Sequence, residues 1–287
     1  MTNRAPATIS VQHVDKRYGE RAALADVSIS AHGGVVTLLG PNGAGKTSLL
    51  RCLATVLAAD GGAVFVDGLD PRQPDERTQI RRRLGYLPQE PRFAANATVF
   101  DVVDYLAIVK EVGPTRSRRA EVGRVLRDVG LGEHLGQKVK TLSGGMVRRI
   151  GIAQAMLGTP SLVVLDEPAA GLDPDQRLLL RDRLSRLGES ATVVLSTHLT
   201  DEAAAFSQSL FVLDGGRVVY AGTPGGLTAT ARGRVWLTES PPSPGPGLRR
   251  SWRTPTGVHR CIGDPPAGAT LDEPTLEDAY LLLVGAP

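Results

Sequence analysis

Hydrophobic and polar residues alternate along the first part of the chain. Ile9 and Val11, and then Val27 and Ile29, are separated by polar residues, and this alternation predicts two half-buried antiparallel strands. Residues 35–39 form instead a nearly continuous apolar run, which is typical of a strand covered on both faces. The N-terminal pattern therefore predicts a small antiparallel sheet followed by a buried strand.

Further buried strands alternate with helices. Residues 161–165 and 191–196 are apolar runs of strand length, and leucines at helical spacing lie between them. Another helical pattern, over residues 49–57, follows the glycine-rich turn after the first buried strand. This alternation predicts right-handed βαβ units around a mainly parallel sheet. From roughly residue 98 to 158 no strand pattern appears and only helical periodicity recurs, which predicts an inserted helical subdomain.

The pattern weakens toward the C-terminus. Residues 223–224 (TP) predict the cap and first position of a short helix. Residues 240–247 (SPPSPGPG) predict a loop or linker, because proline and glycine disfavour both helix and sheet. Weak strand signals around Val235 and Val258 and a final helix from about residue 274 to 284 complete the tail.

Composition favours a globular protein inside the cell. The chain has 287 residues, of which 41% are hydrophobic and 22% charged, enough for one large domain and a small appendage. Its two cysteines, Cys52 and Cys261, lie far apart and form neither a metal-ligand pair nor a disulfide framework, which favours a reducing cytoplasm. The segment MTNRAPATIS lacks the apolar core of a signal peptide, and every apolar run is far shorter than the roughly 18 residues of a membrane-spanning helix. If the protein serves a membrane, we expect another chain to cross it.

The charge pattern argues against a nucleic-acid partner. The formal net charge is +3, and basic residues are interspersed with acidic ones. The densest basic cluster, residues 81–83, is compatible with contact to anionic lipid or nucleic acid. Without interleaved aromatic residues or a second basic strip, it favours a solvated helix face. We therefore expect no nucleic-acid partner.

A glycine-rich loop follows the first buried strand. Residues 40–47 (GPNGAGKT) match the P-loop pattern G-x-x-x-x-G-K-[ST], and Ser48 follows. The glycines allow backbone N–H groups to turn toward phosphate oxygens, and the start of the next helix adds its positive dipole end. Lys46 is expected to reach the β- and γ-phosphates, and the Thr47 hydroxyl to ligate Mg²⁺. The strand before the loop and the helix after it are the context that a P-loop requires.

An apolar strand ending in two acids, residues 162–167 (LVVLDE), is typical of a Walker B segment. At the carboxyl edge of a parallel sheet, Asp166 can help to hold Mg²⁺ and Glu167 can polarise an attacking water. A P-loop and a Walker B segment together occur in GTPases, helicases and kinases as well. These two motifs alone therefore leave the class of nucleotide hydrolase open.

Residues 142–146 (LSGGM) narrow the class of nucleotide hydrolase. Ser143 is expected to cap a helix whose first amides, at Gly144 and Gly145, form a second phosphate-binding device. Here the sequence resembles the ABC (ATP-binding cassette) ATPase family, whose signature is LSGGQ. Met146 stands where the family usually has glutamine, which leaves the serine and the amides unchanged. In that family the signature faces the γ-phosphate on a partner subunit, so the resemblance implies a dimer of cassettes, either identical or different.

Other positions match the family's motifs in the same order along the chain. The resemblance implies that Tyr18 stacks on adenine, although such a strand tyrosine also suits packing. It implies that Gln89 senses Mg²⁺ and the γ-phosphate and that His198 is the switch histidine. Asp173, in the D-loop segment 171–174 (GLDP), is implied at the dimer interface.

The predicted site binds ATP and Mg²⁺, and its residues fall into four groups. The catalytic residues are Glu167, His198 and Lys46. The ATP-binding residues are Tyr18, Gly40, Pro41, Asn42, Gly43, Ala44, Gly45, Lys46, Thr47, Ser48 and Gln89. The Mg²⁺ ligands are Thr47, Gln89 and Asp166. The residues supplied in trans by a partner cassette are Ser143, Gly144 and Gly145.

The predicted fold is α/β. A P-loop NTPase core with a mainly parallel sheet is expected to carry an N-terminal antiparallel β subdomain, an inserted helical subdomain and a small C-terminal appendage. The ATPase domain is expected over residues 7–230, with the insertion at about 90–158. The loop or linker at 240–247 then leads to the appendage at 248–287.

Three classes of ABC protein are considered for this chain. A transporter subunit needs a bare cassette and separate membrane chains, a translation-linked protein usually has two cassettes, and a chromosome or repair ATPase splits its cassette with a long coiled coil. One cassette without a heptad array favours the transporter subunit, bound peripherally to the inner face of the cell membrane through permease subunits on a separate chain. A soluble regulatory ABC ATPase outside transport is the alternative.

Several short segments resemble exporters of the ABC-2 group, which include drug and antibiotic exporters. They are residues 86–89 (YLPQ), 98–101 (TVFD), 105–107 (YLA), 167–174 (EPAAGLDP) and 276–280 (LEDAY). This resemblance implies export. The permease is expected to dock near Gln89 and the insertion, where Phe93 and Phe100 either form a groove for it or simply pack the insertion.

Overall fold

The computed structural model describes residues 5–243, 245 and 247–284. Its centre is a six-stranded sheet. Across the sheet the strands are β5 (Leu84–Leu87), β6 (Leu162–Leu165), β7 (Thr192–Thr197), β3 (Gly34–Leu39), β8 (Ser209–Asp214) and β9 (Arg217–Gly222). All neighbours pair in parallel except β9, which is antiparallel to β8. The mainly parallel sheet predicted from the alternation of strands and helices is confirmed.

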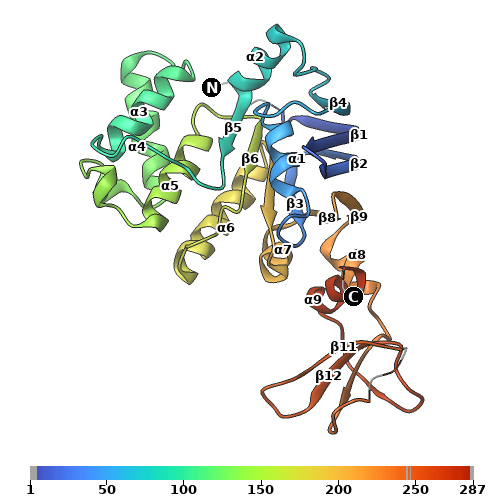
Figure 1. Cartoon of the computed structure of the whole chain (residues 1–287). Coiled ribbons are helices and arrows are strands. Elements are labelled where there is room, and N and C mark those ends of the chain that lie inside the picture. The colour runs from blue at the N-terminus through green and yellow to red at the C-terminus, as the bar shows by residue number, and fades with distance from the viewer. Residues whose placement is uncertain (1–4, 244, 246, 285–287) are drawn as a thin grey trace.

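A smaller antiparallel sheet covers one face. It contains β2 (Arg21–His32), β1 (Thr8–Tyr18) and β4 (Gly61–Val66), in that order. Helix α1 (Lys46–Leu53) lies between the two sheets and contacts strands of both (Figure 1). The alternating apolar residues of β1 and β2 point into this shared core, as the sequence predicted.

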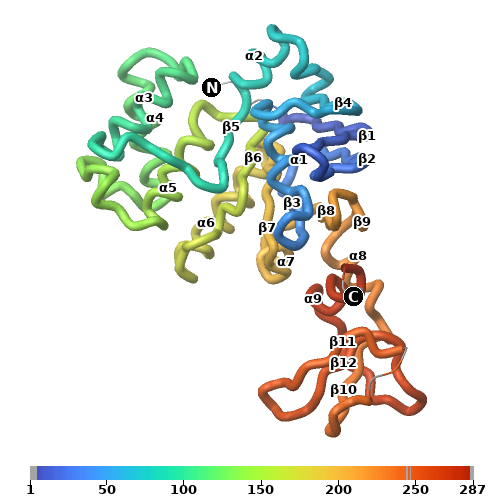
Figure 2. Tube along the Cα trace, in the orientation of Figure 1, coloured from blue at the N-terminus to red at the C-terminus, as the bar shows by residue number. Residues whose placement is uncertain are grey.

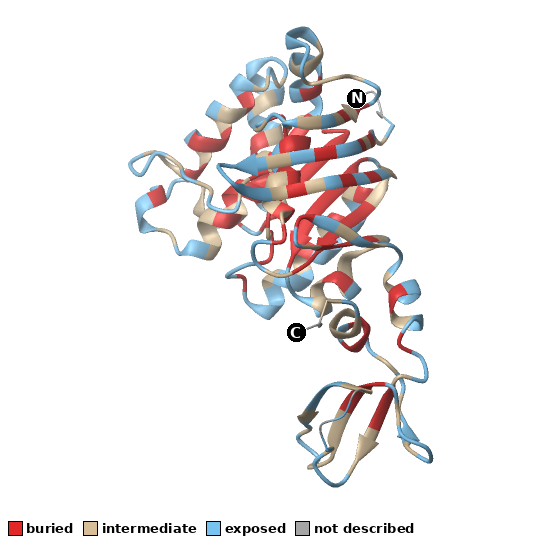
Figure 3. Ribbon diagram, turned by 45° about the vertical axis from the view of Figure 1, so that its right-hand side comes forward, coloured by how far each residue is buried: buried red, intermediate tan, exposed pale blue. Residues whose placement is uncertain are grey.

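Helices cover the other face of the central sheet. Helices α6 (Pro174–Gly188) and α7 (Thr200–Phe206) contact β3 and β7. The insertion contains α3 (Val99–Val109), α4 (Thr115–Asp128) and α5 (Gly144–Ala155), with 3₁₀ turns at Gly132–His134 and Val139–Thr141, and α2 (Pro74–Arg83) precedes β5. The inner faces of α3, α4, α5 and α6 share one apolar core with the sheet, and Figure 3 shows buried residues gathered there, whereas Ile80 of α2 belongs to the core around α1. Within the described part of the chain, no helix is both long and apolar enough to cross a membrane.

The first helix is shorter than its sequence pattern predicts. The apolar spacing extends to residue 57, but α1 ends at Leu53 and Val56 is 60% exposed. Thr55 adopts a left-handed conformation, with φ 57°, which stops the helix. Arg81 of α2 holds this turn, because its guanidinium donates to the Thr55 hydroxyl and carbonyl.

The tail forms its own small sheet next to two helices (Figure 2). Helix α8 (Pro224–Ala229) is capped by Thr223, as predicted. The sheet contains β11 (Leu248–Arg253), β12 (His259–Gly263), β10 (Val235–Thr238) and β13 (Thr270–Leu271), in that order, and α9 (Leu276–Val284) returns to pack on α8 and α7.

The predicted loop or linker at 240–247 falls between β10 and β11 of this sheet. Its described residues, 240–243, 245 and 247, therefore belong to a loop within one unit, and the sheet begins before the predicted boundary at residue 248. The sequence pattern did not predict β11 or β13, because β11 (LRRSWR) is an exposed edge strand rich in arginine and β13 has only two residues. Parts of the predicted N-terminal segment, loop and appendage, namely residues 1–4, 244, 246 and 285–287, lie outside the described residues.

A buried ion pair joins the tail sheet to α9. The guanidinium of Arg260, on β12, donates to both carboxylate oxygens of Asp278, and the Asp278 side chain is only 1% exposed. Asp278 also accepts from the backbone N–H and hydroxyl of Thr275, so it caps α9. Burial alone would raise the pKa of Asp278, but these donors outweigh burial and lower the pKa below its usual value.

We predict that Asp278→Asn destabilises the tail by about 1–3 kcal/mol, because it removes the buried carboxylate that accepts from Arg260 and Thr275 and leaves Arg260 with Asp272 as its remaining counter-ion. Urea unfolding followed by tryptophan fluorescence measures this, since both tryptophans of the chain, Trp236 and Trp252, lie in the tail sheet. Because the pKa of Asp278 is lowered in the folded state, its carboxylate stabilises the wild-type protein fully above about pH 3.9. This stabilisation is lost as the pH falls through the folded-state pKa, so wild type and Asp278→Asn become equally stable in acid. Asp264→Asn, at a carboxylate that is 76% exposed, is the control and should change little.

Candidate functional site

Residues from five strand ends and loops surround one cavity of about 510 Å³ at the carboxyl edge of the central sheet. Its lining residues are Tyr18, Arg21, Ala23, Asn42, Gly43, Gly45, Lys46, Thr47, Ser48, Gln89, Glu167 and His198. A larger cavity, of about 860 Å³, lies in the tail sheet, but its lining brings no such set of catalytic side chains together. The side chains that line the smaller cavity, and not its volume, therefore identify it as the functional site.

The loop between β3 and α1 is shaped by close backbone packing. Gly45 has φ 102°, and a Cβ there would lie 2.3 Å from the carbonyl oxygen of Ala23, so only glycine fits. Lys46 is 6% exposed, and its ammonium donates to the carbonyl oxygens of Gly40 and Pro41 at 2.6 and 2.9 Å. Burial lowers the pKa of Lys46, and the nearby charges of Glu167 and Asp166 oppose this. The loop holds a cation at the start of a helix, an arrangement suited to phosphate.

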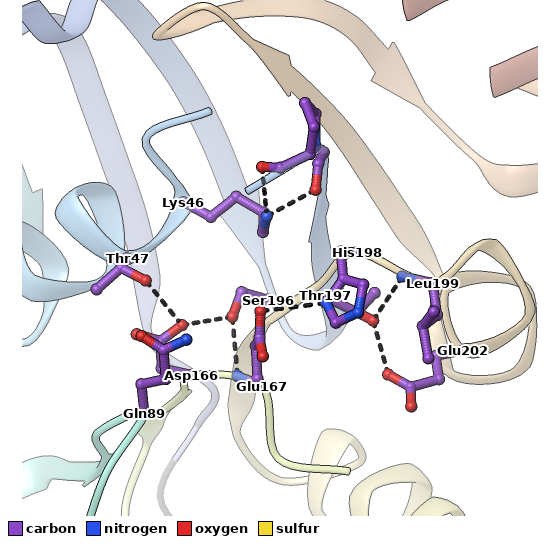
Figure 4. Close-up of polar contacts among 12 residues, drawn as sticks. Lys46, Thr47, Gln89, Asp166, Glu167, Ser196, Thr197, His198, Leu199 and Glu202 are labelled. Atoms are coloured by element: carbon purple, nitrogen blue, oxygen red, sulfur yellow. Dashed lines mark hydrogen bonds and ion pairs between the residues drawn. The ribbon is translucent and has the colours of Figure 1, made fainter. Parts of the chain in front are cut away.

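Asp166 connects this loop to two strands. Its Oδ1 accepts from the Thr47 hydroxyl at 3.2 Å and from the Ser196 hydroxyl at 2.6 Å (Figure 4). The residue is 1% exposed, and among the described residues no donor lies within hydrogen-bond distance of its buried Oδ2. A buried carboxylate oxygen without a donor, next to a hydroxyl, fits a hard cation such as Mg²⁺.

Glu167 follows at the end of β6 in a strained conformation. Its φ is 49°, in the left-handed region that non-glycine residues rarely adopt. Its backbone N–H donates to Ser196 at 2.9 Å, and its Oε1 lies 3.2 Å from Nδ1 of His198. The loop that carries His198 is held by Thr197, whose hydroxyl donates to Glu202 at 2.6 Å and accepts from the N–H of Leu199 at 3.1 Å.

Tyr18 and Gln89, two of the predicted ATP-binding residues, line the same cavity from its rim. Tyr18 is 48% exposed at the end of β1. Gln89 lies just beyond β5, and Figure 4 places its side chain beside Asp166. Three other predicted residues of the loop lie outside the lining: Gly40 and Pro41 accept from Lys46, and Ala44 is buried against the core.

The structure does not bring Ser143, Gly144 or Gly145 into the cavity. Ser143 caps α5, where its hydroxyl accepts from the N–H of Met146 at 3.3 Å. Ser143 and Gly144 are exposed, so this helix end is open to a second molecule. Asp173 likewise lies outside the cavity, where it caps α6 by accepting from Gln176 at 2.8 Å.

Besides Ala23, which lines the cavity, three residues at or beneath the site were not predicted from the sequence. Ser196 bonds to both acids, and its place at the end of a buried strand beside His198 was the available signal. Arg21 lines the cavity near Gly43, and only its place after the Tyr18 turn could have indicated it. Arg148 is buried beneath the site, in the second turn of a helix whose cap the sequence did identify.

Comparison with known proteins identifies the family. Residues 24–170 match the family model described as "ABC transporter". The chain belongs to the ABC transporter family. Its cassette is therefore an ABC ATPase domain.

Relatives of this ABC chain carry related names. A probable multidrug ABC transporter ATP-binding protein, YbhF, of Escherichia coli (strain K12) is 31% identical over 97% of the chain. The chain spans about half of that protein's length, 52%. A Nod factor export ATP-binding protein I of Burkholderia orbicola is 36% identical over 77% of the chain, which covers 72% of that protein.

A solved structure shares the fold of this ABC cassette. It is the dimeric post-hydrolysis state of the ATP-binding cassette MJ0796 bound to ADP and Pi. The two chains are 26% identical with a TM-score of 0.68, over 75% of this chain and 98% of that one. The predicted P-loop ATPase fold is thus confirmed.

We predict that Ser196→Ala lowers both stability and the rate of ATP hydrolysis. The change leaves the Glu167 N–H buried without its acceptor, at a cost of about 1–3 kcal/mol, and frees the Asp166 carboxylate to rotate. Urea unfolding and a steady-state ATPase assay measure the two effects. Ser190→Ala, at an exposed serine just beyond α6, is the matched control; equal behaviour of the two variants would contradict the role given to Ser196.

Proposed function

We propose that this chain is the ATP-binding and hydrolysing subunit of an ABC transporter, in which ATP-driven pairing of two cassettes drives export by separate membrane subunits. The observation that carries the proposal is the gathering of Lys46, Thr47, Glu167 and His198 around one cavity, with Asp166 hydrogen-bonded to Thr47. These are the side chains that positioning and charge stabilisation of a transferred phosphoryl group require.

Each side chain has a role in this proposal. Lys46 and the loop amides bind the β- and γ-phosphates, and Tyr18 stacks on adenine at the rim. Glu167 orients the attacking water and accepts its proton. His198, within 3.2 Å of Glu167, contacts the γ-phosphate and reports its presence. The strained backbone of Glu167 fixes the direction from which the water is held.

Thr47, Asp166 and Gln89 are the residues that would hold Mg²⁺. The buried Oδ2 of Asp166, which has no donor among the described residues, supports this assignment. When bound, Mg²⁺ neutralises the charge on the β- and γ-phosphates. Ser196 keeps the carboxylate of Asp166 turned toward Thr47.

A second cassette completes the site in this proposal. The capped end of α5 presents Ser143 and the amides of Gly144 and Gly145 to solvent, away from the chain's own cavity. A phosphate-binding helix end that its own site does not use is suited to a γ-phosphate bound by another copy or a related chain. Asp173 would then lie at the interface between the cassettes, and hydrolysis would remove the group that bridges them.

The proposal of export through a permease rests on the names of the relatives and on one apolar surface. The names of relatives from Escherichia coli and Burkholderia orbicola refer to multidrug transport and Nod factor export. Helix α3 exposes an apolar surface formed by Tyr105, Ile108 and Val109, each more than half exposed. Phe100 belongs to the same helix, and Phe93 and Phe100 pack partly against the core of the insertion. We assign this surface to permease docking, which would place the chain on the inner face of the cell membrane.

We predict that Glu167→Gln abolishes steady-state hydrolysis while ATP still binds, because the amide cannot accept a proton from water but the P-loop is unchanged. Size-exclusion chromatography with Mg-ATP should then show a stable dimer. Glu189→Gln, at the exposed end of α6, is the matched control and should hydrolyse ATP normally. Normal turnover by the Glu167 variant would remove this residue from the mechanism.

We predict that Phe93→Asp prevents assembly with a multi-helix membrane protein while leaving the ATPase activity of the isolated subunit within about twofold of wild type. Affinity purification from detergent-solubilised membranes of the source organism, with the captured chain identified by mass spectrometry, measures assembly. Leu271→Asp, at a 55% exposed leucine in the tail, is the control. Capture of ribosomes or of no membrane protein by the wild type would instead favour a regulatory ATPase.

A further inference from the structure

Arg148 lies in the interior, directly beneath the site. It occupies the second turn of α5 and is 9% exposed. All of its hydrogen bonds in the described part of the chain go to backbone carbonyl oxygens. Nη2 donates to Asp166 at 2.8 Å and also to Glu167, Nε donates to Pro168 at 3.2 Å, and Nη1 donates to Gln89 at 3.0 Å.

These carbonyl oxygens belong to two different loops. Gln89 follows β5, whereas residues 166–168 follow β6, and the two strands are neighbours in the sheet. A guanidinium is planar and carries five N–H donors in a fixed arrangement, so it can hold both loops at once. A lysine ammonium is a single point charge on a flexible stem and cannot span the same acceptors. Arg148 thus fixes the distance between the loops that carry the glutamine and the two acids.

Glu167 needs such support because of its backbone. Its left-handed φ of 49° is a conformation that persists only where the surroundings hold it. Ser196 accepts from its N–H, and Arg148 donates to its carbonyl oxygen. Both polar backbone groups of Glu167 are therefore tied to other elements, and the direction of its side chain depends on both ties.

We propose that Arg148 is a positioning residue for ATP hydrolysis: from the helix that Ser143 caps, it holds the backbone of Glu167 and of Gln89 in the geometry that hydrolysis requires. The inference rests on the proposed function of this site. Arg148 and Ser143 lie on the same helix end, less than two turns apart. Contact of a partner's nucleotide with Ser143 is thereby linked mechanically to the orientation of Glu167 in the chain's own site.

The test compares Arg148→Gln and Arg148→Lys with Arg149→Gln. Arg149 is the adjacent arginine of α5, and it donates to carbonyl oxygens of Val129 and Gly130 in the insertion, away from the site. The affinity for a fluorescent ATP analogue and the fraction of molecules that bind it are measured first. Steady-state ATPase activity is then expressed per binding-competent molecule, which separates positioning from folding.

We expect Arg148→Gln to lower kcat by about tenfold to a hundredfold, with the nucleotide Kd within about twofold of wild type. Arg148→Lys keeps the buried charge, so it serves if the glutamine variant does not fold, and it should still lose at least about threefold in kcat because one ammonium cannot hold both loops. Arg149→Gln should keep the wild-type kcat per binding-competent molecule.

A purely structural role for Arg148 would reduce the fraction that binds nucleotide and leave kcat per bound molecule unchanged, and that result overturns the inference. An equal loss of kcat in Arg149→Gln also overturns it. If the wild-type chain binds ATP but does not hydrolyse it, the proposed function fails instead, and the two failures are therefore distinguishable.

Discussion

The hydrogen bond between Ser196 and Asp166 joins the carboxyl ends of β6 and β7, and the site depends on it. Parallel strands deliver their C-terminal residues to one edge of a sheet, so the P-loop after β3, the acids after β6 and the histidine after β7 all arrive there. Placement of these residues at one edge of the sheet still leaves their side chains free to rotate. The Ser196 hydroxyl removes that freedom, because it binds the carboxylate of one acid and the backbone N–H of the next.

The main features of the fold could be predicted because they repeat a simple pattern. Strands β3, β6 and β7 are buried on both faces, which produces a continuous apolar run in the sequence. Strands β1 and β2 are buried on one face, which produces alternation of apolar and polar residues. The edge strand β11 shows neither pattern, because three arginines and a serine stand among its six residues. The end of α1 was missed because Thr55 stops the helix by a backbone conformation that the apolar spacing does not encode.

The candidate site shows the same limit. Residues whose side chains act on the ligand, such as Lys46 and Glu167, stand in short motifs and were predicted, and the structure gathers them around one cavity. Ser196 and Arg148 act on other residues of the protein, and their partners are distant in sequence. Arg148 bonds to Gln89, which precedes it by most of the insertion, and only the folded chain brings the two together. Such contacts depend on tertiary structure, which local patterns do not reveal.

The apolar core beneath the tail determines where the chain can be shortened. One buried cluster includes Leu210 and Val212 of β8 together with Leu227 of α8, Ile262 of β12 and Ala279 of α9. A protein cut after α8 would present the β8 side of that cluster to water. The tail thus shields apolar surface of the cassette from water, and a minimal ATPase made for crystallisation or fusion has to retain α9 or replace the apolar residues that it covers.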